Sequence, residues 1–183
     1  KIPGNVSLVA MLAQLKHGPS IRLRDAAANI HTNIFVDRID VPDDQLVRWY
    51  GANPALVSRL NDEITRFDLG IRKMEIRNTV GGPQAFFEHE GLAIPMPWGL
   101  ESHGTRSFIR SFPLLSEALR CGGVAVVDEI DIAIHPLVLP EIVRWFHDPG
   151  RNPNGAQLWM ACHNASLLED LEKEEVFFCE KDT

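Results

Sequence analysis

The stretch Gly122-Gly123-Val124-Ala125-Val126-Val127-Asp128-Glu129 decides the fold of this chain. Its unbroken apolar run, Val124 to Val127, predicts a short β-strand buried on both faces, because strands of parallel sheets have this pattern. Two carboxylates follow directly, and open α/β sheets bind ligands in the crevice at the carboxyl ends of their strands. We therefore expect Asp128 and Glu129 to lie in such a crevice. A structural reading stays open, because acidic residues also favour the N-terminus of a helix.

The segments that follow alternate between helical and strand patterns. Helices are expected near residues 105–119, near 140–146 and from 166, and strands at 158–162 and 176–179. This alternation predicts an α/β fold with a parallel sheet.

The segments before about residue 100 predict helices and a β-hairpin, without this alternation of helix and strand. Residues 71–77 and 84–90 flank Gly81-Gly82-Pro83 and predict a β-hairpin. Apolar residues at helical spacing predict that the chain up to about residue 70 is helical. The helices expected there cover residues 8–15, 25–35, 42–50 and 54–67.

Composition limits the possible classes of protein. The 183 residues include 18 Lys and Arg against 25 Asp and Glu, a net charge of −7, which disfavours a broad basic surface for nucleic acid. No apolar run approaches the ~18 residues of a membrane span, and the first residues lack a signal-peptide pattern, so we expect a cytoplasmic protein without a membrane partner. The three cysteines form no C-x-x-C pair, which disfavours a disulfide framework or a thiolate metal site.

Two further motifs could contact phosphate. Ser102-His103-Gly104-Thr105 comes at the head of a predicted helix, where backbone N–H groups and hydroxyls suit an anion. Ser and Thr are also ordinary helix caps, so that simpler reading stays open. His163 follows the strand predicted at 158–162 and should face the same crevice as Asp128, although such a histidine can also be merely a satisfied polar residue.

Taken in order, S-H-G-T, V-V-D-E-I-D followed by H-P, and a strand ending in C-H-N resemble the C-terminal half of an ABC-type ATPase domain. More narrowly, the chain resembles bacterial ATP-binding proteins of the AAA-15/AAA-21 type, which are related to OLD-family and SMC-like ATPases. The resemblance is sharpest over residues 100–182. It implies a partial P-loop NTPase fold with a parallel sheet, flanking helices and an N-terminal helical insertion.

The resemblance also implies roles for single residues. Ser102, Gly104 and Thr105 would form the signature loop, which contacts the γ-phosphate of ATP held by a partner subunit. In the acidic motif, Asp128 would be the Walker B ligand of Mg²⁺ and Glu129 the catalytic glutamate. Asp131 would lie in the D-loop and His163 would be the switch histidine, with His135-Pro136 as the family's usual continuation. His103, Cys162 and Asn164 depart from the commonest forms of these motifs, and we expect them to modulate function.

One expected motif is absent from the 183 residues. They contain no G-x-x-x-x-G-K-[ST], the Walker A loop that holds the β- and γ-phosphates. We therefore expect a fragment without its N-terminal lobe, which alone would bind ATP poorly and hydrolyse it negligibly. Residues 1–78 would be a helical insertion or arm, and residues 79–183 the C-terminal half of the ATPase core.

The leading hypothesis is a Mg²⁺-dependent ATPase whose homodimer sandwiches ATP between the phosphate loop of one subunit and the signature loop of the other. The alternative is a catalytically incomplete, ATPase-like interaction or regulatory module, which the missing Walker A loop would favour. A third possibility, an ATPase coupled to a nuclease or to DNA, rests on family analogy alone.

Overall fold

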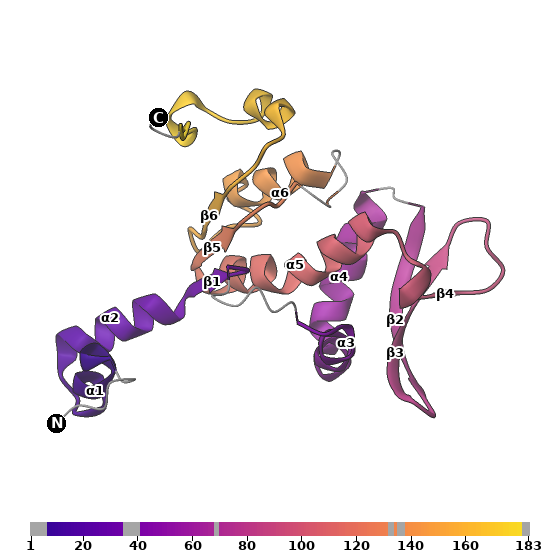
Figure 1. Ribbon diagram of the computed structural model, residues 1–183, viewed down its shortest axis with the longest axis horizontal. Coiled ribbons are helices and arrows are strands. Elements are labelled where there is room, and N and C mark those ends of the chain that lie inside the picture. The colour runs from indigo at the N-terminus through magenta and orange to yellow at the C-terminus, as the bar shows by residue number, and fades with distance from the viewer. Residues whose placement is uncertain (1–6, 35–40, 68–69, 132–133, 135–137, 181–183) are drawn as a thin grey trace.

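The computed structural model describes residues 7–34, 41–67, 70–131, 134 and 138–180. Its α-helices are α1 (Leu8–Gln14), α2 (Gly18–Ala28), α3 (Asp43–Ala52), α4 (Pro54–Arg66), α5 (His103–Cys121) and α6 (Val138–His147). Its strands are β1 (Ile30–Thr32), β2 (Ile71–Thr79), β3 (Gly82–His89), β4 (Met96–Pro97), β5 (Val124–Val127) and β6 (Gln157–Met160). Figure 1 shows two sheets with α3, α4 and α5 between them, and α1 and α2 extending away from the body.

The first sheet is parallel and has the order β1-β5-β6. This confirms an α/β fold with a parallel sheet. The interpretation of residues 25–35 as a helix is wrong, because α2 ends at Ala28 and Ile30–Thr32 form β1, which pairs with β5. Three residues carry too little periodicity to indicate a strand, and the pairing with β5 creates it.

Burial of β5 is one-sided. Ala125 and Val127 are buried, whereas Val124 and Val126 are only half-buried. Val126 pairs with Trp159 of β6, whose side chain is 61% exposed. The expectation of a strand fully buried on both faces is therefore wrong for the described residues, since Val124 and Val126 on one face are only half-buried there.

Two glycines make the junction between α5 and β5. Gly122 ends α5 with a left-handed backbone, φ +67°, which glycine adopts without a steric penalty. A Cβ at Gly123 would lie 2.3 Å from the backbone oxygen of Asn29, so only glycine allows this close approach. The same oxygen accepts a hydrogen bond from the Val124 N–H at 2.9 Å, which begins the pairing of β5 with the β1 segment.

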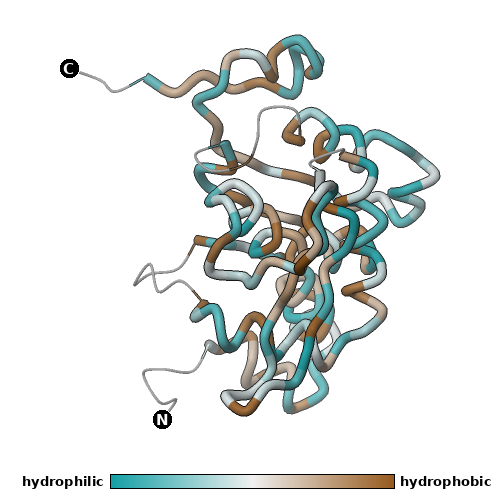
Figure 2. The backbone as a smooth tube through the Cα atoms, turned by 90° about the vertical axis from the view of Figure 1, so that its right-hand side faces the viewer, coloured by the Kyte–Doolittle hydropathy of each residue, from teal (hydrophilic) through white to brown (hydrophobic). Residues whose placement is uncertain are grey.

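The second sheet is antiparallel and has the order β2-β3-β4. It confirms the predicted hairpin, with β2 and β3 joined at Val80-Gly81. Asn61 of α4 fixes β2 from the inside, because its side chain accepts from the Met74 N–H at 2.7 Å and donates to the Met74 C=O at 2.9 Å. Figure 2 shows hydrophobic and hydrophilic residues following one another along the hairpin, and Ile71, Met74, Ala85 and Phe87 are its buried apolar residues.

Helix α5 contains Pro113, and α3 compensates for it. Proline has no N–H, so the Ile109 C=O, four residues earlier, loses its helical partner. The Tyr50 hydroxyl of α3 donates to that carbonyl at 2.7 Å inside the core. Nearby, the ring of Phe67 packs on Phe108 and Trp145, with centroids 5.2 and 5.9 Å apart, and so joins α4 to α5 and α6.

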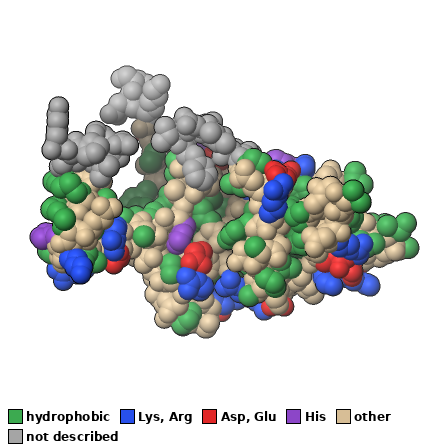
Figure 3. All heavy atoms as spheres, turned by 90° about the horizontal axis from the view of Figure 1, so that it is seen from below, with side chains coloured by type: hydrophobic (Ala, Val, Ile, Leu, Met, Phe, Trp, Pro, Cys, Tyr) green, Lys and Arg blue, Asp and Glu red, His purple; other side chains and the backbone are tan. Residues whose placement is uncertain are grey.

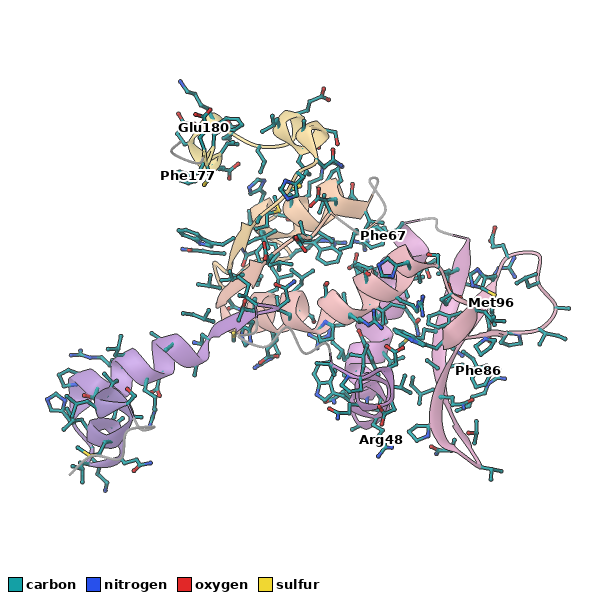
Figure 4. The ribbon with its side chains drawn as sticks, viewed as in Figure 1. Arg48, Phe67, Phe86, Met96, Phe177 and Glu180 are labelled. Carbon is teal, nitrogen blue, oxygen red and sulfur yellow. The ribbon has the colours of Figure 1, made fainter. Side chains whose placement is uncertain are left out.

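After β6 the chain forms two 3₁₀ helices, Ala165–Glu169 and Lys173–Glu175. The first is capped by Asn164, which accepts from the Ser166 N–H, and it takes the place of the helix expected from Ser166. The strand predicted at 176–179 is absent from the described residues. Figure 4 shows Phe177 in a segment away from both sheets, and its side chain is 82% exposed, so its β-propensity has no neighbouring strand to pair with.

The division at residues 78 and 79 remains a prediction. The pairing of β2 with β3 crosses it, and β1 on its N-terminal side joins the parallel sheet. Among the described helices, none combines the length and apolar character needed to cross a bilayer.

Candidate functional site

Asp128 lies directly beyond β5, where its backbone is fixed by a residue from beyond β1. The Asn33 side chain accepts from the Asp128 N–H at 2.8 Å and donates to the Asp128 C=O at 3.0 Å. The backbone is therefore held on both sides, while the carboxylate makes no hydrogen bond to a described residue and is open to solvent. The Asp128 backbone is thus held at the carboxyl edge of the sheet, and its side chain extends from there into solvent. Sequence reasoning missed Asn33, since its partner is 95 positions away.

Glu129 has a left-handed backbone conformation, which residues other than glycine rarely adopt. Its φ is +53°, in the left-handed region, and its side chain is exposed. A non-glycine residue there carries strain of about 1–3 kcal/mol, and such residues cluster at functional sites. The chain bends at Asp128 and Glu129, directly after β5, so the two neighbouring carboxylates lie at the end of one strand.

Asp131 and His163 meet at the same edge. The Asp131 Oδ2 accepts from the backbone N–H of His163 at 2.9 Å. β5 and β6 are parallel neighbours, with Val127 opposite Met160, so both loops leave the sheet on one side. His163 and Asp128 thus follow neighbouring strands at the same edge of the sheet, and the expectation that they face one crevice stays a prediction. Burial raises the pKa of the thiol of Cys162, the residue directly before His163.

The motif Ser102 to Thr105 forms the first turn of α5. The Ser102 Oγ accepts from the Thr105 N–H at 3.0 Å and lies 2.8 Å from the Thr105 Oγ1, so Ser102 is a helix cap. Gly104 is part of this turn. α5 leads back to β5 through the short junction at Gly122-Gly123, and His103 of its first turn lines the same groove as Asp128.

A groove connects α5 with the acidic edge. Its volume is about 720 Å³, within the range of small-molecule sites. Asp128 and Glu129 line it together with Thr32, Asn33 and His103. Of the other residues predicted for the site, Ser102, Gly104, Thr105, Asp131 and His163 lie outside its described lining. His135-Pro136 falls outside the described residues.

The residues present fit Mg²⁺ in a limited way. The described residues contain no group of three or more His, Cys, Asp or Glu side chains that could hold a metal on their own. Mg²⁺ commonly keeps several waters and is bound through one or two carboxylates together with substrate phosphates. The exposed carboxylate of Asp128 suits such a shared site, with phosphate oxygens and waters as the other ligands.

The surface carries mixed charge. On the face seen in Figure 3, Lys and Arg side chains lie interspersed with Asp and Glu, and no broad basic patch is visible among the described side chains there. Several basic residues are paired, as in the contacts of Arg120 with Glu117 and Arg151 with Glu63. This distribution agrees with the net charge of −7.

Comparison with known families places these features in context. A family model described as "AAA domain, putative AbiEii toxin, Type IV TA system" matches residues 10–169, more than half of the chain. The chain belongs to this AAA family. Its members have nucleotide-binding, ATPase-type domains, and the mixed α/β fold with a parallel sheet is compatible with a P-loop NTPase-like domain. No curated protein matches the chain.

Membership of the AAA family implies ATP as the ligand, and Mg²⁺ is its usual companion. The family match extends from α1 to the first 3₁₀ helix after β6, so it includes Asn33, Asp128 and His163. The individual roles of these residues are the subject of the proposal that follows.

Proposed function

We propose that this chain is the ATP-binding and ATP-hydrolysing part of a dimerising, Mg²⁺-dependent ABC-type ATPase. The observation that carries the proposal is the placement of Asp128 and Glu129 in one groove at the carboxyl end of β5, with His163 at the same edge beyond β6. The pairing of Asn33 with the Asp128 backbone supports it, because a catalytic carboxylate must be held in a fixed position.

In this proposal each residue has a separate task. Asp128 would hold Mg²⁺, which when bound neutralises the developing charge on the phosphates. Glu129 would orient and deprotonate the attacking water, since it is exposed and lines the groove beside Asp128. His163 would hold the terminal phosphate or the water through its imidazole, and Asp131 would position His163 through the backbone hydrogen bond.

The first turn of α5 would complete the nucleotide site of the other subunit. Ser102 caps this turn, and Gly104 and Thr105 lie beside it at the positive end of a helix of 19 residues. A helix N-terminus attracts a phosphate by its free N–H groups and its dipole. We therefore place the γ-phosphate of ATP held by the partner against Ser102, Gly104 and Thr105.

The replacement of Glu129 by Gln tests the proposal in the full-length gene product. Loss of a general base typically slows the chemical step by about 10²- to 10⁴-fold, so hydrolysis should fall by at least roughly 100-fold while Mg-ATP binding is retained. Glu169→Gln, at an exposed glutamate beyond the site, is the matched control and should hydrolyse ATP at the wild-type rate. Hydrolysis by Glu129→Gln at the wild-type rate would show that Glu129 is not the base.

A second candidate is an ATPase-like interaction or regulatory module that has lost its nucleotide. In this candidate the groove at β5 would no longer hold ATP. Calorimetric titration of Mg-ATP into the full-length gene product separates the two candidates. Measurable binding supports the ATPase, and the absence of any binding heat over a range of temperatures supports the module.

A further inference from the structure

Glu101 is a buried carboxylate directly before the cap of α5. Only 2% of its side chain is exposed, although glutamate is among the residues least often found inside proteins. Its Oε1 lies 2.5 Å from the Nε2 of His89, the last residue of β3. A buried carboxylate is strongly destabilising unless a partner satisfies it, and His89 is the partner that the described residues supply.

The segment before Glu101 is fixed to the same strand and to α5. The Glu101 N–H donates to the Trp98 C=O at 3.1 Å. The Trp98 ring, which is 8% exposed, packs against Phe87 of β3 at a centroid distance of 6.1 Å. The guanidinium of Arg110 from α5 also lies over the Trp98 ring, 6.0 Å from its centroid. β3, the turn at Trp98 and the first half of α5 therefore form one packed unit.

The segment after Glu101 is the proposed phosphate-contacting turn. Ser102 follows Glu101 directly and caps α5 through the Thr105 N–H. The position of Ser102 is thus determined by a neighbour that is itself bonded to the end of β3. Any displacement of β3 relative to α5 would change the entry of the chain into this turn.

We propose that His89 and Glu101 are positioning residues, which hold the turn Ser102 to Thr105 in place and couple it to the sheet β2-β3-β4. This inference rests on the proposed function for its consequence, since the turn completes the nucleotide site of a partner subunit. It assigns the antiparallel sheet a role in the ATPase: a ligand or protein that shifts β3 changes the affinity of the two subunits for each other in the presence of ATP.

The first test needs neither nucleotide nor ATPase activity. In His89→Ala, hydrogen exchange of the Thr105 amide, measured by NMR, should accelerate at least tenfold relative to the wild type. His89→Gln retains a donor of similar reach and should exchange more slowly than His89→Ala. Arg72→Gln is the matched control, because Arg72 pairs with Glu90 on the same hairpin at 3.4 Å but both side chains are exposed. Unchanged Thr105 exchange in His89→Ala would overturn the positioning role.

The second test uses the full-length gene product. Impaired positioning at an active site can lower a rate by about 100-fold. His89→Ala should therefore weaken ATP-driven association and lower kcat by roughly 10- to 100-fold, with Mg-ATP affinity at low subunit concentration unchanged. His89→Gln should restore most of the lost association and kcat. A variant that merely misfolded would also lose Mg-ATP affinity, so an effect limited to association and kcat indicates positioning.

The two failures are distinguishable. If Thr105 exchange accelerates in His89→Ala while association and kcat match the wild type, the link between the pair and the nucleotide site is wrong. If the wild-type gene product itself binds no Mg-ATP, the proposed function fails, and the consequence assigned to the pair fails with it.

Discussion

Replacing Tyr50 with Phe should destabilise the protein by about 1–3 kcal/mol, the cost of leaving one buried hydrogen-bonding group without a partner. The group is the Ile109 C=O, which cannot bond within α5 because Pro113 has no N–H. The Tyr50 hydroxyl donates to it at 2.7 Å, and Tyr50 and Ile109 are 1% and 0% exposed. Water therefore cannot replace the lost donor without opening the core. For a chain of this size, a loss of ~2 kcal/mol lowers Tm by about 4–8 °C.

A double-mutant cycle with Pro113→Ala tests the reason for this cost. Alanine at position 113 supplies an N–H that can bond to the Ile109 C=O, so Tyr50→Phe should cost at least about 1 kcal/mol less in that background. The free energy of unfolding of all four variants is measured by urea titration with circular dichroism. Equal costs in the two backgrounds would refute the reasoning, since they would show that the hydroxyl is not compensating for the proline.

The same contact predicts a dependence on pH. Burial raises the pKa of Tyr50 well above its usual value, and Tyr50 is the one tyrosine of the sequence. The unfolded chain releases the tyrosine proton near pH ~10, whereas the folded chain keeps it, so this group makes stability fall as the pH rises above ~10. Tyr50→Phe should remove that contribution. The check is the difference in unfolding free energy between the two proteins, which should narrow as the pH rises past 10.

Three further predictions concern single residues. Glu129→Gly should be more stable than Glu129→Ala by roughly 0.5–1 kcal/mol in urea unfolding. Glycine adopts the left-handed φ of +53° without strain, and its larger unfolded-state entropy offsets only part of that gain. Equal stabilities would contradict the proposed backbone strain at Glu129. Asn33→Ala removes both hydrogen bonds to the Asp128 backbone, so it should lower the free energy of unfolding by about 1–2 kcal/mol. It should also raise the Mg²⁺ concentration needed for half-maximal ATPase activity. An unchanged Mg²⁺ dependence would show that Asn33 does not position the metal site. Burial raises the pKa of Glu63, and this effect exceeds the opposite effect of the nearby positive charge of Arg66, which lowers that pKa. The folded state then binds the proton more tightly than the unfolded state, so this group lowers stability as the pH rises from about 4.5, and Glu63→Gln should flatten that part of the stability profile measured by thermal unfolding.

The sequence predicts the elements whose signal is local. The apolar run of β5, the hairpin around Gly81-Gly82 and the spacing of Leu56, Leu60 and Ile64 in α4 each identify an element that the structure contains. These segments are long or strongly patterned, and their local preference agrees with their burial. Helix α5 is likewise predicted, although it continues through Pro113, because Tyr50 compensates for the missing N–H.

The errors have a common physical cause in tertiary pairing. Ile30–Thr32 is too short to show strand periodicity and becomes β1 through contact with β5. Residues 176–179 have strong β-propensity, yet they form no strand in the described structure, where the side chains of Phe177 and Phe178 are 82% exposed. A strand requires a partner that satisfies its backbone groups, and propensity alone does not indicate whether a partner is present.

At the candidate site, too, the sequence identifies the residues but not the contacts that position them. The motif V-V-D-E identifies the acids and their location at the end of a strand, but the contacts that orient the site come from distant segments. Asn33 is 95 positions from Asp128, Asp131 is 32 positions from His163, and His89 is 12 positions from Glu101. The first two contacts join loops at the carboxyl edge of the parallel sheet, and the third joins the residue before the α5 cap to the end of β3. The positions of the proposed catalytic groups therefore depend on the packing of the whole chain, and variants at Asn33 or His89 should alter activity although neither belongs to a recognised motif.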